Sequence, residues 1–441
     1  MQKQPTDRST SRPSLDRLSS GVRSRDTRNM FARLAELSVY GANVQKGQIV
    51  IVNAEIGLEE QARATAEAAY KRGAKFVDVV YFDPYVKRVR IENADPDTLD
   101  FVPEWYGERV PRHAEQHGAR INLRGVTAPN LTHGLDKALL GKDMLPTVKE
   151  TFKVFDERLI NWGYVPAPHP AWATLVHPDL PADEAYEKLW RDLEHILRLD
   201  EPDPLAAWDE RMAELNDCAQ RLTERRFDAI ELRGPGTELN IGLLSTAIWT
   251  TVDFSTAKGL RHISNLPSEE VFTTPDPLRT NGHVTATKPL VLNDGTIIHG
   301  LRVRFENGVA VEIDADENAE VLRSLTEIDE GARRLGELAL VDGEGRIGPL
   351  ETVFYDTLLD ENASSHIALG NGFPFVIEEE DRKRANASAR HIDFMIGSPE
   401  LDVDGVTLDG EWIPVLRNLA WQLPPRTGPL NVSREGRGSR W

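Results

Sequence analysis

The segment Gly47-Gln-Ile-Val-Ile-Val-Asn53 contains four consecutive β-branched, apolar residues, which is typical of a buried strand. An alanine-rich helical pattern follows over 59–72 and stops at Gly73. The segment Phe76-Val-Asp-Val-Val-Tyr-Phe82 then predicts a second strand. A strand, a helix and a strand in this order indicate a parallel sheet with helices on its faces.

The alternation of helix and strand extends outward from this segment. Helical spacing runs from Met30 to Val39, and a helical pattern over 112–118 followed by a strand over 119–123 adds one more unit. No Gly-x-Gly-x-x-Gly motif follows the first strand, so the sequence does not support a dinucleotide site. Residues from about 130 to 225 are predicted to be mainly helical.

The pattern changes after about residue 227, where strands predominate. The strands predicted over 301–305 and 309–313 flank Asn307-Gly308, a strong hairpin signal. A helix is predicted from Ala319 to about Arg334. The second half of the chain is therefore expected to be a mixed α+β, strand-rich unit.

Together these patterns predict an α/β fold with two domains and a tail. Residues 1–27 are rich in Ser, Arg and Asp and have almost no apolar period, which predicts a flexible tail. Residues 28–225 form the predicted N-terminal α/β domain, with a parallel sheet, flanking helices and a helical extension. Residues 226–441 form the predicted C-terminal domain.

Composition limits the kinds of partner and the compartment. The formal net charge of −19 disfavours a nucleic-acid partner, which needs a basic face. The sequence has neither a long apolar run nor an apolar N-terminal signal region, so we expect no membrane partner and no secretion. The one cysteine, Cys218, cannot form an internal disulfide, so we expect a cytoplasmic location and a packing role for its side chain.

Two adjacent carboxylates, Glu269 and Glu270, occur in Leu266-Pro-Ser-Glu-Glu-Val-Phe-Thr273. On an extended segment neighbouring side chains point to opposite sides. One carboxylate can therefore face a metal ion while the other faces the substrate or a hydrogen-bond network. An acidic pair at the protein surface is the alternative interpretation.

A third carboxylate, Glu337, lies at the end of the predicted helix and directly before an apolar run. Burial of a carboxylate is costly unless it meets a cation. Glu337 is therefore a candidate metal ligand, and an ion pair with Arg333 or Arg334 is the alternative.

Two histidines complete the set of candidate ligands. His366 lies among small residues, after the acceptors of Asp360-Glu-Asn362 that can fix its tautomer, and a core histidine is the alternative. In His391-Ile-Asp393 a strand would place the histidine and the aspartate on one face, although such a tripeptide also occurs by chance. Ligands of these types suit zinc, manganese, cobalt or ferrous iron.

Further blocks accompany these motifs along the chain: Val44-Gln-Lys-Gly-Gln48, Ala68-Ala-Tyr-Lys-Arg-Gly-Ala-Lys75, Asp203-Pro-Leu-Ala-Ala-Trp208, Arg233-Gly-Pro-Gly-Thr-Glu-Leu239 and Phe354-Tyr-Asp-Thr-Leu-Leu-Asp-Glu-Asn-Ala-Ser-Ser-His366. In this order they resemble the aminopeptidase T and aminopeptidase S family of metallo-aminopeptidases. The resemblance extends from about Met30 to Trp421, nearly the whole predicted fold.

This resemblance implies a pair of divalent metal ions (zinc, cobalt or manganese, or else iron) that activate a water and hold the free N-terminus of a peptide. Carried over to this sequence, the implied ligands are Glu270, Glu337, His366, His391 and Asp393. Glu269 would lie beside them, as the base or as a carboxylate that supports the ligands, so that Glu269 and Glu270 are the implied catalytic carboxylates. The C-terminal domain is accordingly the implied metal-binding catalytic domain. The family also implies a homodimer whose sites face an internal cavity, which would limit the substrate to small peptides.

The sequence departs from the family pattern at one position. A tyrosine is expected seven residues after the first ligand histidine, and Phe373 stands there. Phenylalanine has no hydroxyl, and loss of one such donor to an oxyanion typically costs about a hundredfold or more in turnover. Phe373 and Tyr355, whose hydroxyl is a candidate replacement, are predicted to line the substrate pocket.

Three functions follow as hypotheses. The first is a broad-specificity aminopeptidase that hydrolyses the N-terminal residue of short peptides by metal-activated water. The second is a different metalloenzyme on the same scaffold, either an amidase for a small or aromatic amide or a ferrous ring-cleaving enzyme resembling dihydroxypyridine dioxygenase. The third is a non-catalytic binding protein, against which the presence of all five implied ligands argues.

Overall fold

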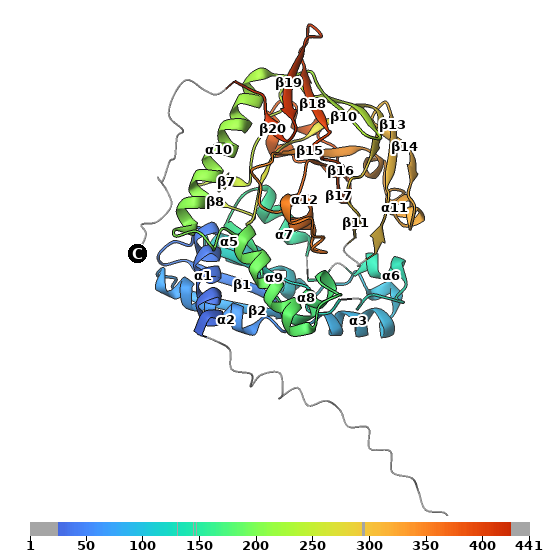
Figure 1. The fold of residues 1–441 in the computed structure, drawn as a ribbon. Helices are drawn as coiled ribbons and strands as arrows, with labels where there is room; N and C mark the ends of the chain where they lie inside the picture. The colour runs from blue at the N-terminus through green and yellow to red at the C-terminus, as the bar shows by residue number, and fades with distance from the viewer. Residues whose placement is uncertain (1–24, 130, 144, 147, 293–295, 425–441) are drawn as a thin grey trace, which may run out of the picture.

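The computed structural model describes residues 25–129, 131–143, 145–146, 148–292 and 296–424 (Figure 1). Its N-terminal part contains a four-stranded sheet in the order β2-β1-β3-β4, with all three strand pairs parallel. The strands are β1 (Ile49–Glu55), β2 (Phe76–Phe82), β3 (Ala119–Arg124) and β4 (Asn161–Pro166). The predicted parallel sheet is therefore confirmed.

Helices flank this sheet: α1 (Arg25–Gly41), α2 (Glu59–Lys71), α3 (Pro84–Asn93), α4 (Glu104–Gly107), α5 (Arg109–Glu115), α6 (Lys137–Lys142) and α7 (Lys149–Asp156). The small side chains of Ala62 and Ala69 let α2 approach β1 closely. They share a buried cluster with Val50 and Val52 of that strand. This cluster forms the core between the sheet and α2.

A helical extension follows β4 and consists of α8 (Pro170–Val176), α9 (Ala182–Ile196) and α10 (Pro204–Arg225). The Asp203 side chain accepts a hydrogen bond from the Ala206 amide, which caps the start of α10. Arg226, with a φ of 48°, ends the helix in a left-handed conformation. In Figure 1 α10 runs from the N-terminal part up along the strand-rich part of the molecule.

The C-terminal half contains an eight-stranded sheet in the order β14-β13-β10-β6-β5-β18-β19-β20. Its strands are β5 (Ala229–Gly234), β6 (Thr237–Leu243), β10 (Pro275–Thr285), β13 (Arg302–Glu306), β14 (Val309–Asp314), β18 (Asp402–Val406), β19 (Trp412–Arg417) and β20 (Ala420–Trp421). The predicted hairpin at Asn307-Gly308 is confirmed, because β13 and β14 pair antiparallel across it. Two smaller ribbons pair β7 (Asp253–Ser255) with β8 (Arg261–Ile263) and β11 (Leu290–Val291) with β12 (Ile297–Ile298).

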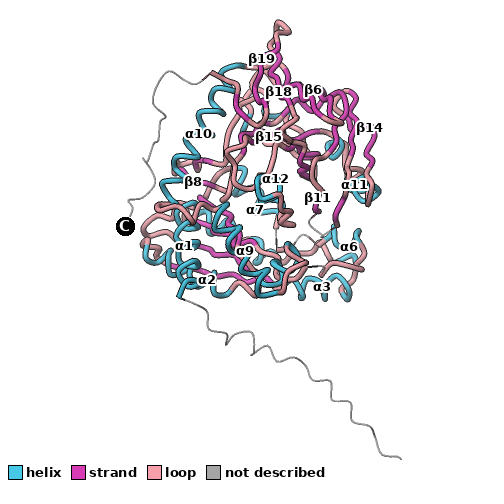
Figure 2. The backbone as a smooth tube through the Cα atoms, in the orientation of Figure 1, coloured by secondary structure: helices cyan, strands magenta, loops and turns pink. Residues whose placement is uncertain are grey.

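A separate four-stranded antiparallel sheet has the order β17-β16-β15-β9. Its strands are β9 (Glu270–Thr273), β15 (Leu335–Val341), β16 (His366–Gly370) and β17 (His391–Met395), and the short helix α12 (Thr357–Glu361) precedes β16. Figure 2 shows the contrast between the helix-rich N-terminal part and the strand-rich C-terminal part. The predicted α/β class with a strand-rich second half is confirmed.

Two local predictions differ from the structure. The helix predicted over 319–334 is shorter: α11 (Ala319–Leu325) ends early, and Glu337 lies on β15 rather than at a helix end. Leu335 and every other residue of β15 are buried, so burial in the sheet outweighs the helical spacing of the sequence. The predicted tail over 1–27 lies outside the described residues up to residue 24, and residues 25–27 belong to α1.

The largest hydrophobic core crosses the predicted boundary between residues 225 and 226. Trp172 and Trp208 from the helical extension belong to the same buried cluster as Ile230 and Leu232 of β5 and Leu338 of β15. The helical extension therefore packs on the strand-rich half as well as following the parallel sheet in sequence. The domain boundary stays a prediction.

Within the described residues, no helix combines the length and the apolar character needed to cross a membrane.

Candidate metal centre

All five predicted ligands lie on the four-stranded antiparallel sheet. Glu270 begins β9, Glu337 is the third residue of β15, and His366 begins β16. His391 and Asp393 are the first and third residues of β17, so they share one face of that strand as predicted. Because these strands are hydrogen-bonded neighbours, residues far apart in the sequence come together on one sheet.

The ligand atoms fall into two groups that share one carboxylate. Glu270, Glu337 and His366 form the first cluster, and Glu337, His391 and Asp393 form the second cluster. Within each cluster the three donor atoms lie within 4.8 Å of one another. The two oxygens of Glu337 divide between the clusters: Oε1 lies 4.0 Å from His366 Nε2, and Oε2 lies 3.0 Å from His391 Nε2. The structure thus brings the predicted ligands together in an arrangement with two adjacent positions for a cation.

Hydrogen bonds on the far side of each imidazole fix its orientation. Nδ1 of His366 lies 3.2 Å from the Ser364 carbonyl oxygen, and Nδ1 of His391 lies 2.7 Å from that of Asn371. A carbonyl oxygen only accepts, so Nδ1 carries the proton in both rings. The Nε2 atoms therefore face the clusters, which is the usual arrangement of histidines that bind a metal.

The donor set fits a metal ion for a second reason. Oε2 of Glu270 and Oδ1 of Asp393 are buried and have no hydrogen-bond partner among the described residues, although each lies close to a histidine. The distance is 3.2 Å from Glu270 Oε2 to His366 Nε2 and 3.1 Å from Asp393 Oδ1 to His391 Nε2. Buried carboxylate oxygens that point at imidazole lone pairs need a proton or a cation between them.

The electrostatics of the clusters show how strongly a positive charge is favoured. Burial opposes protonation of His366, but the carboxylate of Glu270, 3.2 Å away, and the charges of Glu337 and Asp393 outweigh it and raise its pKa to about 10. Desolvation opposes protonation of His391 as well, although its side chain is 29% exposed, but the neighbouring Asp393 and Glu337 raise its pKa well above the usual value. Burial raises the pKa of Glu337 itself. The same negative charges that favour protonation of the histidines would also favour binding of a divalent cation.

Glu361, a residue absent from the predicted ligand set, also belongs to this environment. Burial raises its pKa well above the usual value, and the charges of Asp393, Glu270 and Glu337 add to the effect. It is the last residue of α12 and belongs to neither cluster. The sequence marks Asp360-Glu-Asn362 only as acceptors that could fix the tautomer of His366, a role that the Ser364 carbonyl oxygen takes in the structure. The turn from α12 into β16 instead brings Glu361 close to the charges of the ligands.

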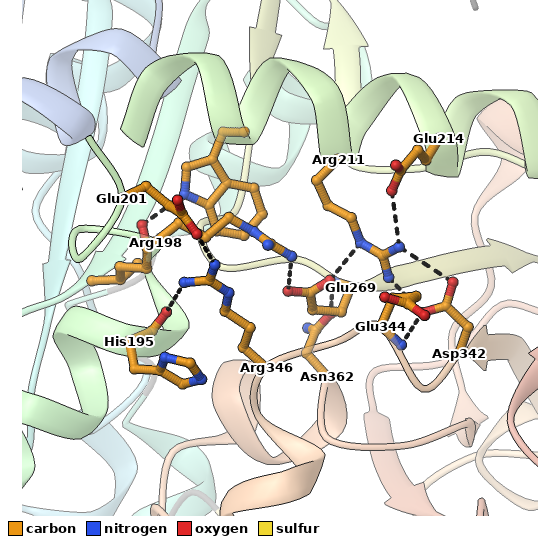
Figure 3. Close-up of polar contacts among 12 residues, drawn as sticks. His195, Arg198, Glu201, Arg211, Glu214, Glu269, Asp342, Glu344, Arg346 and Asn362 are labelled. Atoms are coloured by element: carbon orange, nitrogen blue, oxygen red, sulfur yellow. Dashed lines mark hydrogen bonds and ion pairs between the residues drawn. The ribbon is translucent and has the colours of Figure 1, made fainter. Parts of the chain in front are cut away.

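Glu269 points away from Glu270, as the alternation of an extended segment predicts. Its carboxylate accepts hydrogen bonds from Arg198 Nη2 at 2.9 Å and from Arg211 Nε at 2.7 Å (Figure 3). Both oxygens are thus bound by guanidinium groups. Of the two roles that the sequence left open for Glu269, this geometry favours support of the ligands over that of base.

The two predicted pocket residues differ in what surrounds them. The ring of Phe373 lies beside the ligand His391, with centroids 5.1 Å apart, and also contacts the rings of Phe272 and Phe375. Tyr355 lies in the loop before α12 with a left-handed backbone φ of 56° and packs, half-buried, against the main core. An aromatic wall beside the second cluster is therefore present, and a role for the Tyr355 hydroxyl stays a prediction.

Comparisons with known proteins agree with this geometry. Residues 27–421 match the model of the family described as thermophilic metalloprotease (M29). The chain is 41% identical to aminopeptidase T of Thermus thermophilus over 399 residues, which cover 88% of this chain and 97% of that protein. It is 34% identical to aminopeptidase AmpS of Bacillus subtilis over 404 residues, which cover 89% and 98%.

A solved structure extends the likeness to the fold. The structure of wild-type AmpT from Thermus thermophilus superimposes with a TM-score of 0.83 at 39% sequence identity. The match covers 89% of this chain and 99% of that one.

Proposed function

Because the chain belongs to the thermophilic metalloprotease (M29) family, we propose that its two clusters bind two divalent cations and that it removes the N-terminal residue of short peptides. The chain is a metal-dependent aminopeptidase and therefore a hydrolase, because its family is described as a metalloprotease family and its relatives of 34–41% identity are named aminopeptidases. The observation that carries the more detailed proposal is the carboxylate of Glu337, whose two oxygens face one histidine each.

The first cluster would hold one cation through Glu270, Glu337 and His366, and the second cluster would hold another through Glu337, His391 and Asp393. Bound there, divalent cations lower the pKa of water and polarise a scissile carbonyl. Carboxylate and imidazole ligands without thiolate suit zinc, cobalt or manganese, with iron as a further option.

The residues of the chain supply the rest of the chemistry. Glu337 fixes the spacing of the two positions, and the Nδ1 hydrogen bonds of His366 and His391 keep both Nε2 atoms directed at them. Glu270 contributes a buried carboxylate oxygen without a hydrogen-bond partner, free to bind a cation. Phe373 supplies apolar surface beside His391 but no donor for an oxyanion.

The alternative of a diverged amidase or ring-cleaving dioxygenase is not favoured, because the relatives are named aminopeptidases. Two carboxylates in the first cluster also give more oxygen ligands than a two-histidine, one-carboxylate iron site uses. We also propose that the protein is a homodimer and that it is located in the cytoplasm. Its substrates are proposed to be small peptides.

The proposal is tested with purified protein of measured metal content. Short peptides and aminoacyl amides are offered with free and with blocked N-termini, and release of the first residue from free substrates only is expected. His391→Ala and Asp393→Ala should abolish turnover and lower the metal content while the chain stays folded. His283→Ala, which removes an exposed histidine of β10, is the control. Full activity with unchanged metal in both site variants contradicts the ligand assignment.

A further inference from the structure

The carboxylate of Glu269 is the centre of a buried ion-pair network with Arg198 and Arg211 (Figure 3). Its side chain is 0% exposed, and that of its partner Arg211 is 4% exposed. Glu269 directly precedes the candidate ligand Glu270, so a side chain anchored at 269 fixes the backbone from which residue 270 reaches the cluster. Burial of a charged side chain is strongly unfavourable unless groups of opposite charge pair with it.

Arg211 joins Glu269 to a second buried carboxylate, Asp342. Its Nη2 donates to Asp342 Oδ1 at 2.6 Å and its Nη1 to Asp342 Oδ2 at 3.2 Å. The register that pairs Val341 of β15 with Glu270 of β9 brings Asp342 beside Glu269 where the two strands meet. Two like charges there would repel each other, and the planar guanidinium between them removes that repulsion.

Asn362 attaches a third segment to the same network. Its Oδ1 accepts a hydrogen bond from the Glu269 amide at 2.7 Å, and the residue is fully buried. Asn362 follows α12 and lies four residues before the candidate ligand His366. The network therefore touches the three segments that carry the first cluster: β9 with Glu270, the end of β15 with Glu337, and the turn before His366.

The second cluster is attached differently. Its other two ligands, His391 and Asp393, lie on β17, at the opposite edge of the sheet from β9. The arginines, in contrast, come from the helical extension: Arg198 follows α9 and Arg211 lies on α10. A helical segment of the first half of the chain thus reaches one side of the metal centre.

We propose that Arg211 and Glu269 are positioning residues for the first cluster, so that their loss weakens cation binding there and leaves the second cluster nearly unchanged. This inference rests on the proposed two-cation function. Neither residue touches a cation position, and each acts through the backbone and the strand ends described above. Loss of a group that orients a metal ligand typically lowers metal affinity by about 10–100-fold.

The experiment measures the binding of Co²⁺ to the metal-free full chain by calorimetry and by visible absorption. Wild type should bind two ions. The Arg211→Met and Glu269→Gln variants should bind the ion of the first cluster about 10–100-fold more weakly than wild type does. They should bind the ion of the second cluster with the affinity of wild type. Arg211→Lys keeps the charge but cannot bridge both carboxylates. Its affinity for the ion of the first cluster should therefore lie between that of wild type and that of the other two variants.

The affected position is identified by combining substitutions. In the Arg211→Met background, Glu270→Gln should add little further loss, whereas Asp393→Asn should remove the remaining tight site. Arg346→Met is the matched control. Arg346 also joins the strand-rich half to the segment after α9, through Asp200 Oδ1 at 2.6 Å and through Glu201, but it forms no hydrogen bond or ion pair with Glu269, Asp342 or Asn362.

Three outcomes would overturn the inference. Folded Arg211→Met and Glu269→Gln proteins that bind both ions as wild type does show that the network does not position ligands. Equal weakening of both sites shows a general structural role. A wild type that binds no ion refutes the metal centre itself, which separates failure of the proposed function from failure of the positioning role. If Arg211→Met does not fold, the nearly isosteric Glu269→Gln and the charge-conserving Arg211→Lys give the same distinction.

Discussion

Oε2 of Glu337 lies 3.0 Å from Nε2 of His391, although the two residues are on strands separated by β16. The other oxygen of the same carboxylate faces His366, on the strand between them. One carboxylate thus joins both clusters, and no other predicted ligand belongs to both. The consequences of removing Glu337 should differ from those of removing any other ligand.

Glu337→Gln should therefore lower the occupancy of both cation positions, whereas Glu270→Gln should lower only the first and Asp393→Asn only the second. Loss of a residue that only orients a metal ligand costs up to about a hundredfold in activity. Glu337 is itself a proposed ligand, so turnover should fall at least about a hundredfold in Glu337→Gln. Elemental analysis after equilibration with a fixed free metal concentration gives the stoichiometry. Retention of one full equivalent of metal by Glu337→Gln would show that it does not bridge.

Binding of a cation should release protons. The raised pKa of His366, about 10, and the raised pKa of His391 leave both imidazoles protonated in the metal-free protein at neutral pH. A metal binds the neutral ring, so affinity should rise with pH up to about 10, by about tenfold per pH unit for each proton displaced. Calorimetry at one pH in buffers of different ionisation enthalpy counts the protons. A count of zero would contradict the protonated state.

The buried Asp360 should make stability depend on pH. Burial raises its pKa to about 7, against the opposing hydrogen bonds from the Phe354 and Asp356 amides. A carboxyl whose pKa is raised on folding contributes stability at low pH that is lost as the pH rises from the unfolded value to the folded one. Between pH 5 and pH 7 this loss is on the order of 2–3 kcal/mol.

Asp360→Asn has no such titration, so its stability relative to wild type should improve by roughly that amount from pH 5 to pH 8. The measurement is urea unfolding of the metal-free proteins at both pH values. A difference between variant and wild type that stays constant with pH would mean that Asp360 titrates at its ordinary value.

Phe373→Tyr should raise turnover. The ring lies beside His391, so a hydroxyl added there is placed to donate to a developing oxyanion, an interaction worth about a hundredfold or more in other enzymes. We expect an increase in kcat of at least about tenfold with a smaller change in KM. Phe375→Tyr, in the same aromatic cluster at 5.5 Å, is the control and should leave kcat unchanged. An unchanged or lower kcat in Phe373→Tyr would mean that the apolar wall is itself required.

Much of the fold followed from short-range pattern. The β-branched run from Ile49, the alanine-rich α2 and the Asn307-Gly308 turn each carry their structure in a few neighbouring residues, because strand and helix periods and turn chemistry are local. The prediction was wrong at Glu337, where the helical spacing indicated the end of a helix. The residue instead lies on the fully buried strand β15.

The five predicted ligands were recognisable by residue type and by resemblance, and on β17 the period of a strand even set the common face of His391 and Asp393. Which ligands share a cation position was decided only by tertiary structure. The order β17-β16-β15-β9 places Glu337 between two histidines, and strand order is not encoded in local spacing.

The same holds for the residues around the ligands. No local signal marks Arg211, on a long amphipathic helix, as the partner of Glu269 and Asp342, which lie 58 and 131 residues away. The sequence by itself determined the chemical types at the site and the local elements that carry them. Tertiary structure decided their partners, because the cost of burying a charge is met by whichever opposite charge the packing of distant elements brings within reach.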